Sequence, residues 1–107
     1  MELANGDTLT IYQGDDTNAL GEEIIIVLNC DYDVSGFTAV FQLYNFRQKW
    51  DDISSKRLAI VIPKEETKKF KLGPCCGAIK IYDKQGRART IRDDIKFYVK
   101  SEVVNNG

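Results

Sequence analysis

The chain has 107 residues, 43% hydrophobic and 29% charged, a composition typical of a globular domain rather than of a disordered segment. Its 15 basic and 16 acidic side chains leave a formal charge of −1, which argues against a nucleic-acid-binding face and against a polybasic membrane anchor. No apolar run approaches the ~18–20 residues of a membrane span, and we expect no signal peptide, nucleic-acid partner or membrane partner.

Alternation of apolar and polar residues predicts β-strands in the first half of the chain. Leu9 and Ile11 alternate with polar neighbours and predict the first strand. The aliphatic, mostly β-branched run at 24–28 is too short for a buried helix and predicts a second strand. Renewed alternation over 37–44 predicts a third. The polar segment 47–56 is expected to form a loop or an irregular edge.

The second half of the chain continues this pattern with one interruption. Apolar residues at every second position from Leu58 to Ile62 predict a fourth strand, which Pro63 ends. The segment 64–70 has no β character and follows the proline, so it predicts a short helical crossover. The remaining strands are predicted at 79–81, 88–92 and 95–99, with a hairpin turn at 83–86.

These elements together predict the fold class. About seven short strands with turn signals between them indicate an all-β, immunoglobulin-like antiparallel β-sandwich with one short helical crossover. No internal repeat, linker or low-complexity tract interrupts the sequence. We therefore expect one domain over residues 1–107, with its core at about 7–100 and a frayed tail at 101–107.

Two adjacent cysteines, Cys75 and Cys76, raise the question of a reactive or metal-binding site. A zinc site needs converging ligands, yet the chain has one other cysteine, Cys30, and no histidine. A site of three thiolates completed by a carboxylate stays open, although no C-x-x-C spacing supports it. Neighbours in a strand point to opposite faces, so Cys75 shares the core-facing side with Ile79 while Cys76 faces out. We expect free thiols in a reducing cytoplasm, with Cys75 largely buried, Cys76 more exposed, no disulfide between them, no metal and no cofactor.

The segment DYDVSG at 31–36 matches the opening of an EF-hand calcium loop. The match fails at the twelfth loop position, because Gln42 cannot supply a bidentate carboxylate. The flanking segments also predict strands rather than helices. Since Asp and Gly are ordinary turn residues, we expect this segment to form a turn.

The other charged clusters are expected to be solvated loops. The aspartate pairs at 15–16, 51–52 and 93–94 stand at loop or strand ends, and nothing in the sequence brings one pair to another. The basic segments 68–71 and 84–89 have the character of exposed turns. Without histidine, a general base or an activated thiol lacks its usual partner, so we expect no catalytic residue and no enzyme activity.

Three aromatic residues, Tyr44, Phe46 and Trp50, stand in or beside the polar segment and are the candidate interaction surface. Exposed aromatics in a polar loop would suit a partner surface or a sugar-stacking platform. The alternative is that Trp50 folds back and caps the edge of the core. The sequence leaves both interpretations open.

Several stretches, taken in order, resemble a known family. Residues 11–15 (IYQGD) form an apolar strand closed by a Gln-Gly-Asp turn, and residues 34–43 (VSGFTAVFQL) place Ser-Gly before an alternating strand. Residues 63–67 resemble its short helical turn, residues 79–91 its closing hairpin, and residues 97–99 the end of its last strand. In this order the sequence resembles small immunoglobulin-like domains of tailed bacteriophages, as in the N-terminal part of baseplate upper proteins and related prophage tail proteins.

The resemblance covers about residues 9–100 and carries expectations about function. It implies a non-enzymatic structural or assembly module that acts through protein–protein contacts and has no catalytic residues. The partners implied are other phage structural proteins or further copies of the chain. The location implied is the bacterial cytoplasm after synthesis and the virion tail after assembly. One departure is that Cys75 or Cys76 stands where such domains often have a tyrosine.

A second hypothesis comes from a different functional class. The chain could be a carbohydrate-binding or adhesion module that uses Trp50 and the nearby aromatic side chains. Because Trp50 is the single tryptophan, its fluorescence would report glycan binding directly. The two hypotheses therefore differ in the type of partner, a protein surface or a sugar.

Overall fold

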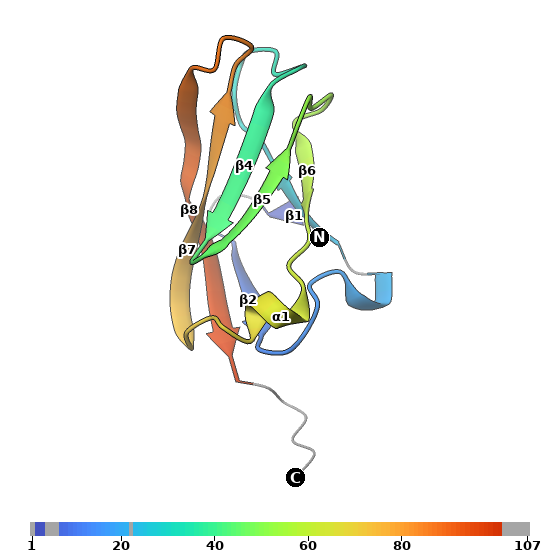
Figure 1. The fold of residues 1–107 in the computed structure, drawn as a ribbon. Helices are drawn as coiled ribbons and strands as arrows, with labels where there is room; N and C mark the ends of the chain where they lie inside the picture. Colours follow the sequence, from blue (N-terminus) through green and yellow to red (C-terminus); the bar gives the residue numbers. More distant parts are fainter. Residues whose placement is uncertain (1, 4–6, 22, 102–107) are drawn as a thin grey trace.

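The computed structural model describes residues 2–3, 7–21 and 23–101, whose strands form two sheets (Figure 1). The three-stranded sheet has the order β1-β3-β6, and the five-stranded sheet has the order β2-β8-β7-β4-β5. Two short helical segments are present, η1 (Ala19–Gly21) and α1 (Lys64–Thr67). The strands are β1 (Glu2–Leu3), β2 (Thr8–Tyr12), β3 (Ile24–Val27), β4 (Thr38–Leu43), β5 (Phe46–Trp50), β6 (Arg57–Ile60), β7 (Gly73–Tyr82) and β8 (Ala88–Lys100).

The predicted all-β sandwich with a short helical crossover is confirmed, with differences in individual strands. The segments predicted at 88–92 and 95–99 lie in one strand, β8. The aspartates between them do not end the strand, because register shifts against β7 accommodate extra residues at this point. The polar segment 47–56 contributes most of β5, which is an edge strand of the larger sheet.

Two strand pairings differ from the antiparallel arrangement expected throughout. β1 runs parallel to β3, and β2 runs parallel to β8. The N-terminal part of the chain therefore contributes one edge strand to each sheet. Side chains alternate with the same period in parallel and antiparallel strands, so the hydrophobic pattern contains no information about pairing direction. The other pairings are antiparallel.

The core lies between the two sheets and is built around aromatic side chains of the five-stranded sheet. Phe41 on β4 and Phe97 on β8 are fully buried and meet edge to face, with ring centroids 6.0 Å apart. Gly77 on β7 lies beneath both rings, and a Cβ there would be 2.7 Å from Cε1 of Phe41. The glycine thus leaves the space that lets these two rings pack. Aliphatic residues of both sheets, such as Ile26 and Ile60, complete the core.

The crossover helix α1 fastens one end of the sandwich through a buried hydroxyl. The Thr67 hydroxyl donates to the Asp15 carbonyl and accepts from the Gly14 amide, each at 3.0 Å. The Gln13 side-chain amide donates to the Phe70 carbonyl at 2.8 Å. The loop after β2 and the crossover after β6 therefore hold each other, although they are about 50 residues apart in sequence.

The edge strands β5 and β6 of the two sheets are joined by one side chain, Gln48. Its Nε2 donates to the Ala59 carbonyl at 3.1 Å, and its Oε1 accepts from the Val61 amide at 2.9 Å. A side-chain amide thus replaces the backbone pairing that an edge strand lacks. Unpaired strand edges are sites of unwanted pairing, so Gln48 closes this side of the sandwich.

A buried cation, Arg92, lies on the inner side of β8. Its guanidinium Nη1 donates to the Leu3 carbonyl of β1 at 3.5 Å, and its Nε lies 3.6 Å from Oδ1 of the exposed Asp94. Arg92 is 7% exposed. This arginine links β8 to the opposite sheet, so its charge belongs to the interior of the fold rather than to its surface.

Candidate functional site

The outer face of the five-stranded sheet carries the polar half of each alternating strand. Along β4, the core residues Ala39 and Phe41 alternate with Thr38, Val40 and Gln42 on the outer face. The same alternation operates in β5 and β7. Any function of this face therefore depends on the outward-pointing residues between the core positions, which the hydrophobic pattern does not distinguish from one another.

Cations occupy many of these outer positions. Val40 on β4 pairs with Lys49 of β5 on one side and with Lys80 of β7 on the other. Cross-strand neighbours on one face have Cβ atoms about 5 Å apart, so the two lysines flank a single apolar residue. We use the term basic face for the exposed outer-face cations Arg47, Lys49, Lys80, Lys96 and Lys100.

Acidic residues are few on the basic face. Among the paired outer-face positions of the five-stranded sheet that the structure describes, none is acidic. The exposed Asp93 and Asp94 are unpaired and lie at the irregularity of β8, close to Lys96. Asp51 stands just beyond the end of β5, and Asp83 stands just beyond the end of β7. The formal charge of −1 for the whole chain therefore conceals a local positive surface.

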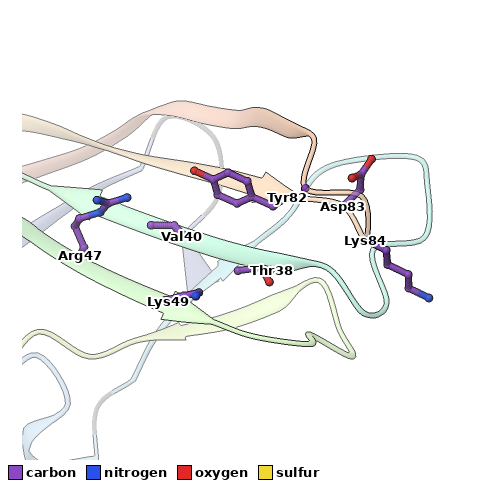
Figure 2. A pocket seen from close by; sticks show the side chains of 8 residues that line it. Thr38, Val40, Arg47, Lys49, Tyr82, Asp83 and Lys84 are labelled. Carbon is purple, nitrogen blue, oxygen red and sulfur yellow. The ribbon is translucent and has the colours of Figure 1, made fainter.

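A shallow groove of about 650 Å³ lies at one end of the basic face (Figure 2). Figure 2 shows Val40 and Tyr82 on neighbouring strands, with Arg47 and Lys49 on the next strand beyond Val40. Lys84 extends from the turn after β7. The groove therefore combines an apolar and aromatic floor with cationic side chains around it. Its lining residues are Thr38, Val40, Arg47, Lys49, Tyr82, Asp83, Lys84 and Gly86.

The carboxylate of Asp83 at the end of the groove is engaged within its own turn. Its Oδ2 accepts from Nε of Arg87 at 2.7 Å, and its Oδ1 accepts from the backbone amides of Gln85 and Arg87, each at 2.9 Å. These bonds, led by the Arg87 backbone amide, lower the pKa of Asp83 below its usual value. Asp83 is thus an ionised turn residue with its hydrogen bonds already formed, unsuited to act as a base.

A second carboxylate, Asp51, rests on the margin of the groove. Its Oδ1 lies 3.5 Å from Nζ of Lys49 and accepts from the Thr38 hydroxyl at 3.4 Å. Both members of the ion pair are well exposed, so the pair adds little to stability. It does establish that a carboxylate can reach a lysine and a hydroxyl of this groove together.

The candidate aromatic surface from the sequence is split between the core and the outside. Phe46 is half-buried and meets Phe41 edge to face at 6.3 Å, and Trp50 is half-buried against the core. Tyr44, at the turn between β4 and β5, is 37% exposed and lies 5.2 Å from the Phe70 ring. The three residues therefore do not form one outward-facing platform. Phe46 and Trp50 share the inner side of β5 with Gln48.

The two adjacent cysteines lie on opposite sides of β7, as the alternation predicts. Cys76 is exposed, Cys75 is half-buried rather than largely buried, and both thiols are free, as is Cys30. Cys75 packs against the edge of the core and forms a side-chain hydrogen bond with Tyr44. Burial raises the pKa of the Cys75 thiol, and burial followed by the hydrogen bond with that thiol raises the pKa of Tyr44.

The segment that resembles a calcium loop is a hydrogen-bonded turn. Oδ1 of Asp33 accepts from the Ser35 amide at 3.0 Å and from the Ser35 hydroxyl at 2.7 Å. These bonds, the backbone bond first, lower the pKa of Asp33. No group of three cysteine or carboxylate side chains that could hold a metal ion comes together within the described residues.

Sequence reasoning missed the basic face because it considered charge as runs and totals. Arg47 and Lys49 alternate with residues of the inner side of β5, and Lys80 alternates with Ile79 and Ile81. No two of these cations are adjacent in sequence. The signal that would identify them is a cation at every second position of a strand, considered together with its cross-strand partners.

Comparisons with known proteins add no family to this description. No protein-family model matches the sequence, and no curated protein is significantly similar to it. Among the residues that the structure describes, no helix is long and apolar enough to cross a membrane. The function is therefore inferred from the residues and their geometry.

Proposed function

We propose that the chain is a non-enzymatic structural module that assembles with other proteins, as a phage or prophage tail or baseplate domain does. The observation that carries the proposal is the basic face, a set of exposed cations on a paired sheet. Side chains that stand on a rigid sheet lose less freedom on binding than side chains on a loop. The sequence resemblance over about residues 9–100 supports the assignment to tail proteins.

The chemistry of the groove favours binding over catalysis. Arg47, Lys49 and Lys84 are cations, and Asp83 is already bound by its own turn. A general base must be within reach of a substrate proton and must have a pKa near the working pH. The carboxylate that lines this groove, Asp83, has a lowered pKa and hydrogen bonds already formed within its own turn. An interaction surface requires only a shape and a charge that complement those of its partner, and the cations and apolar floor of this groove suit an anionic partner.

A carbohydrate-binding role has less support from the geometry. Sugar rings stack on exposed aromatic faces, whereas Phe46 and Trp50 pack against the core. Tyr44 is exposed, but its ring lies against Phe70. We therefore rank the carbohydrate hypothesis below assembly with proteins.

Co-expression with the products of neighbouring genes tests the proposed function. Each product is purified together with the chain, and light scattering measures the mass and stoichiometry of the complex. We expect a complex of fixed stoichiometry with a protein encoded nearby, or a closed oligomer of the chain itself.

Two results would contradict the proposal. One is a chain that stays monomeric at about 100 μM and forms no complex with any neighbouring product, since assembly contacts operate well within that range. The other is saturable quenching or enhancement of Trp50 fluorescence by a defined bacterial glycan. That result would favour the carbohydrate hypothesis.

A further inference from the structure

We infer that the basic face and its groove bind a carboxylate-rich, extended segment of a partner protein. The inference rests on the proposed assembly function and adds the chemistry of the partner. Three features of the molecule support it: the spacing of the cations, the Asp51 carboxylate at the margin of the groove, and the apolar floor.

The spacing of the cations matches an extended acidic segment. Arg47 and Lys49 are two residues apart on β5, so their Cα atoms are about 7 Å apart on the same face. Side chains on one face of an extended segment repeat at the same distance. Two carboxylates at alternate positions of such a segment would therefore meet Arg47 and Lys49 in register.

Asp51 provides an intramolecular example of this contact. Its carboxylate reaches both Nζ of Lys49 and the Thr38 hydroxyl from the end of β5. Among the residues that the structure describes, neither Arg47 nor Lys80, on the other side of Val40, forms an ion pair. A partner carboxylate can therefore repeat, at Arg47 and Lys80, a contact that the fold itself already makes at Lys49.

The floor of the groove favours a polypeptide over a polyphosphate. Val40 and Tyr82 are half-buried, so the methylene stems of acidic side chains would cover them. The most exposed outer-face tyrosine is Tyr98 on β8, which is 43% exposed. Tyr98 pairs with Pro74, and Pro74 lies eight residues from Tyr82 along β7. That is about 26 Å away in a strand, so Tyr98 and Tyr82 are too far apart to stack on successive bases of one nucleic-acid strand.

The net charge of the chain gives a second argument against a nucleic acid. A long polyanion interacts with the field of the whole surface, and the total formal charge here is −1. A short acidic segment interacts with the local cations, because screening limits exposed charges to about 8 Å at physiological ionic strength. The local positive face therefore selects a short anionic partner.

The test uses a labelled probe peptide in which glutamate and threonine alternate, and two matched double variants of the full chain. The variant Lys49→Glu/Lys80→Glu reverses the two lysines that flank Val40. The control Lys68→Glu/Lys71→Glu reverses two exposed lysines beside α1 and makes the same change in net charge. An oligothymidylate of the same length replaces the peptide in a parallel titration, and fluorescence anisotropy measures both.

We expect the peptide to bind the unaltered chain, more weakly as salt rises, and Lys49→Glu/Lys80→Glu to weaken binding about tenfold or more. The control variant should stay within about twofold, since its lysines lie at the other end of β7 from Lys80 and the groove. Equal losses in both variants, no peptide binding at low salt, or tighter binding of the oligothymidylate that depends on Lys49 and Lys80 would each overturn the inference.

The inference and the proposed function can fail separately. A complex with a neighbouring gene product that is insensitive to Lys49→Glu/Lys80→Glu leaves assembly standing and rejects this face as its site. Peptide binding without any such complex would support the inference that the basic face binds an acidic segment and would contradict the proposed assembly function. Thermal melting of each variant identifies a loss of folding.

Discussion

The two faces of the five-stranded sheet are built from the same strands and yet differ in composition and burial. On β4, Phe41 is fully buried while its neighbour Val40 lies between two lysines on the surface. On β7, Ile79 and Ile81 are buried and Lys80 is exposed. A period of two residues thus separates the core residues from the residues of the proposed interaction surface, and a substitution on one face should leave the other largely unchanged.

The largest expected effect is on the inner face, at Phe41. Replacement by alanine removes the ring that contacts both Phe46 and Phe97. We expect Phe41→Ala to lower the free energy of unfolding by about 3–5 kcal/mol. Chemical denaturation measures the change, and Val40→Ala on the outer face is the control, expected to cost less than about 1 kcal/mol. Similar losses for both would contradict the division between the faces.

A smaller loss is expected where the inner face has no room for a side chain. A Cβ at Gly77 would be 2.7 Å from Cε1 of Phe41 and 3.2 Å from Cε2 of Phe97. We expect Gly77→Ala to lower the free energy of unfolding by about 1–3 kcal/mol, because the rings must shift. The outward neighbour Ala78 serves as the control, with Ala78→Ser expected within about 0.5 kcal/mol. An unchanged stability of Gly77→Ala would mean that this part of the core is loosely packed.

The next effect concerns the side chain that joins the two sheet edges. Gln48→Ala leaves the Ala59 carbonyl and the Val61 amide without the partners that Gln48 supplies. We expect a loss of about 1–2 kcal/mol in the free energy of unfolding, less if water reaches these groups. The comparison variant is Gln42→Ala on the outer face, whose side chain makes one exposed bond to the Tyr44 carbonyl. Equal stability of the two variants would indicate that water replaces the bridge.

The mildest test is chemical and leaves the fold intact. Cys76 on the outer face should react with a thiol-alkylating reagent before Cys75, because Cys75 is half-buried and its raised pKa lowers its thiolate fraction. The rate at Cys75 should continue to rise as the pH approaches its raised pKa from below. Mass spectrometry of time points, with Cys76→Ser as the control, follows both sites. Faster labelling of Cys75 would contradict the assignment of faces.

Strand alternation predicted much of this architecture from the sequence. Alternating segments identified the central strands and the opposite orientation of Cys75 and Cys76. It did not identify β5, because Gln48 is polar and yet occupies an inner position, where its amide bridges the sheets. It did not indicate that Asp93 and Asp94 lie within β8, since aspartates normally mark strand ends.

The basic face could not be predicted from composition for a related reason. Net charge sums over the chain, whereas the fold collects cations on one face and leaves many carboxylates in turns, such as Asp33 and Asp83. The row of Lys49, Val40 and Lys80 comes from β5, β4 and β7, and β7 is separated from the other two in sequence by β6 and α1. Only the register between the strands brings these residues together.

Lysine acetylation footprinting tests the central claim most directly, because each molecule contains both the proposed contact residues and its own controls. The chain is acetylated alone and in the complex with its neighbouring gene product, and mass spectrometry measures the rate at each lysine. We expect protection of Lys49 and Lys80 on the basic face, with Lys68 and Lys71 beside α1 unchanged. Protection of Lys68 and Lys71 with no change at Lys49 and Lys80 would contradict that claim.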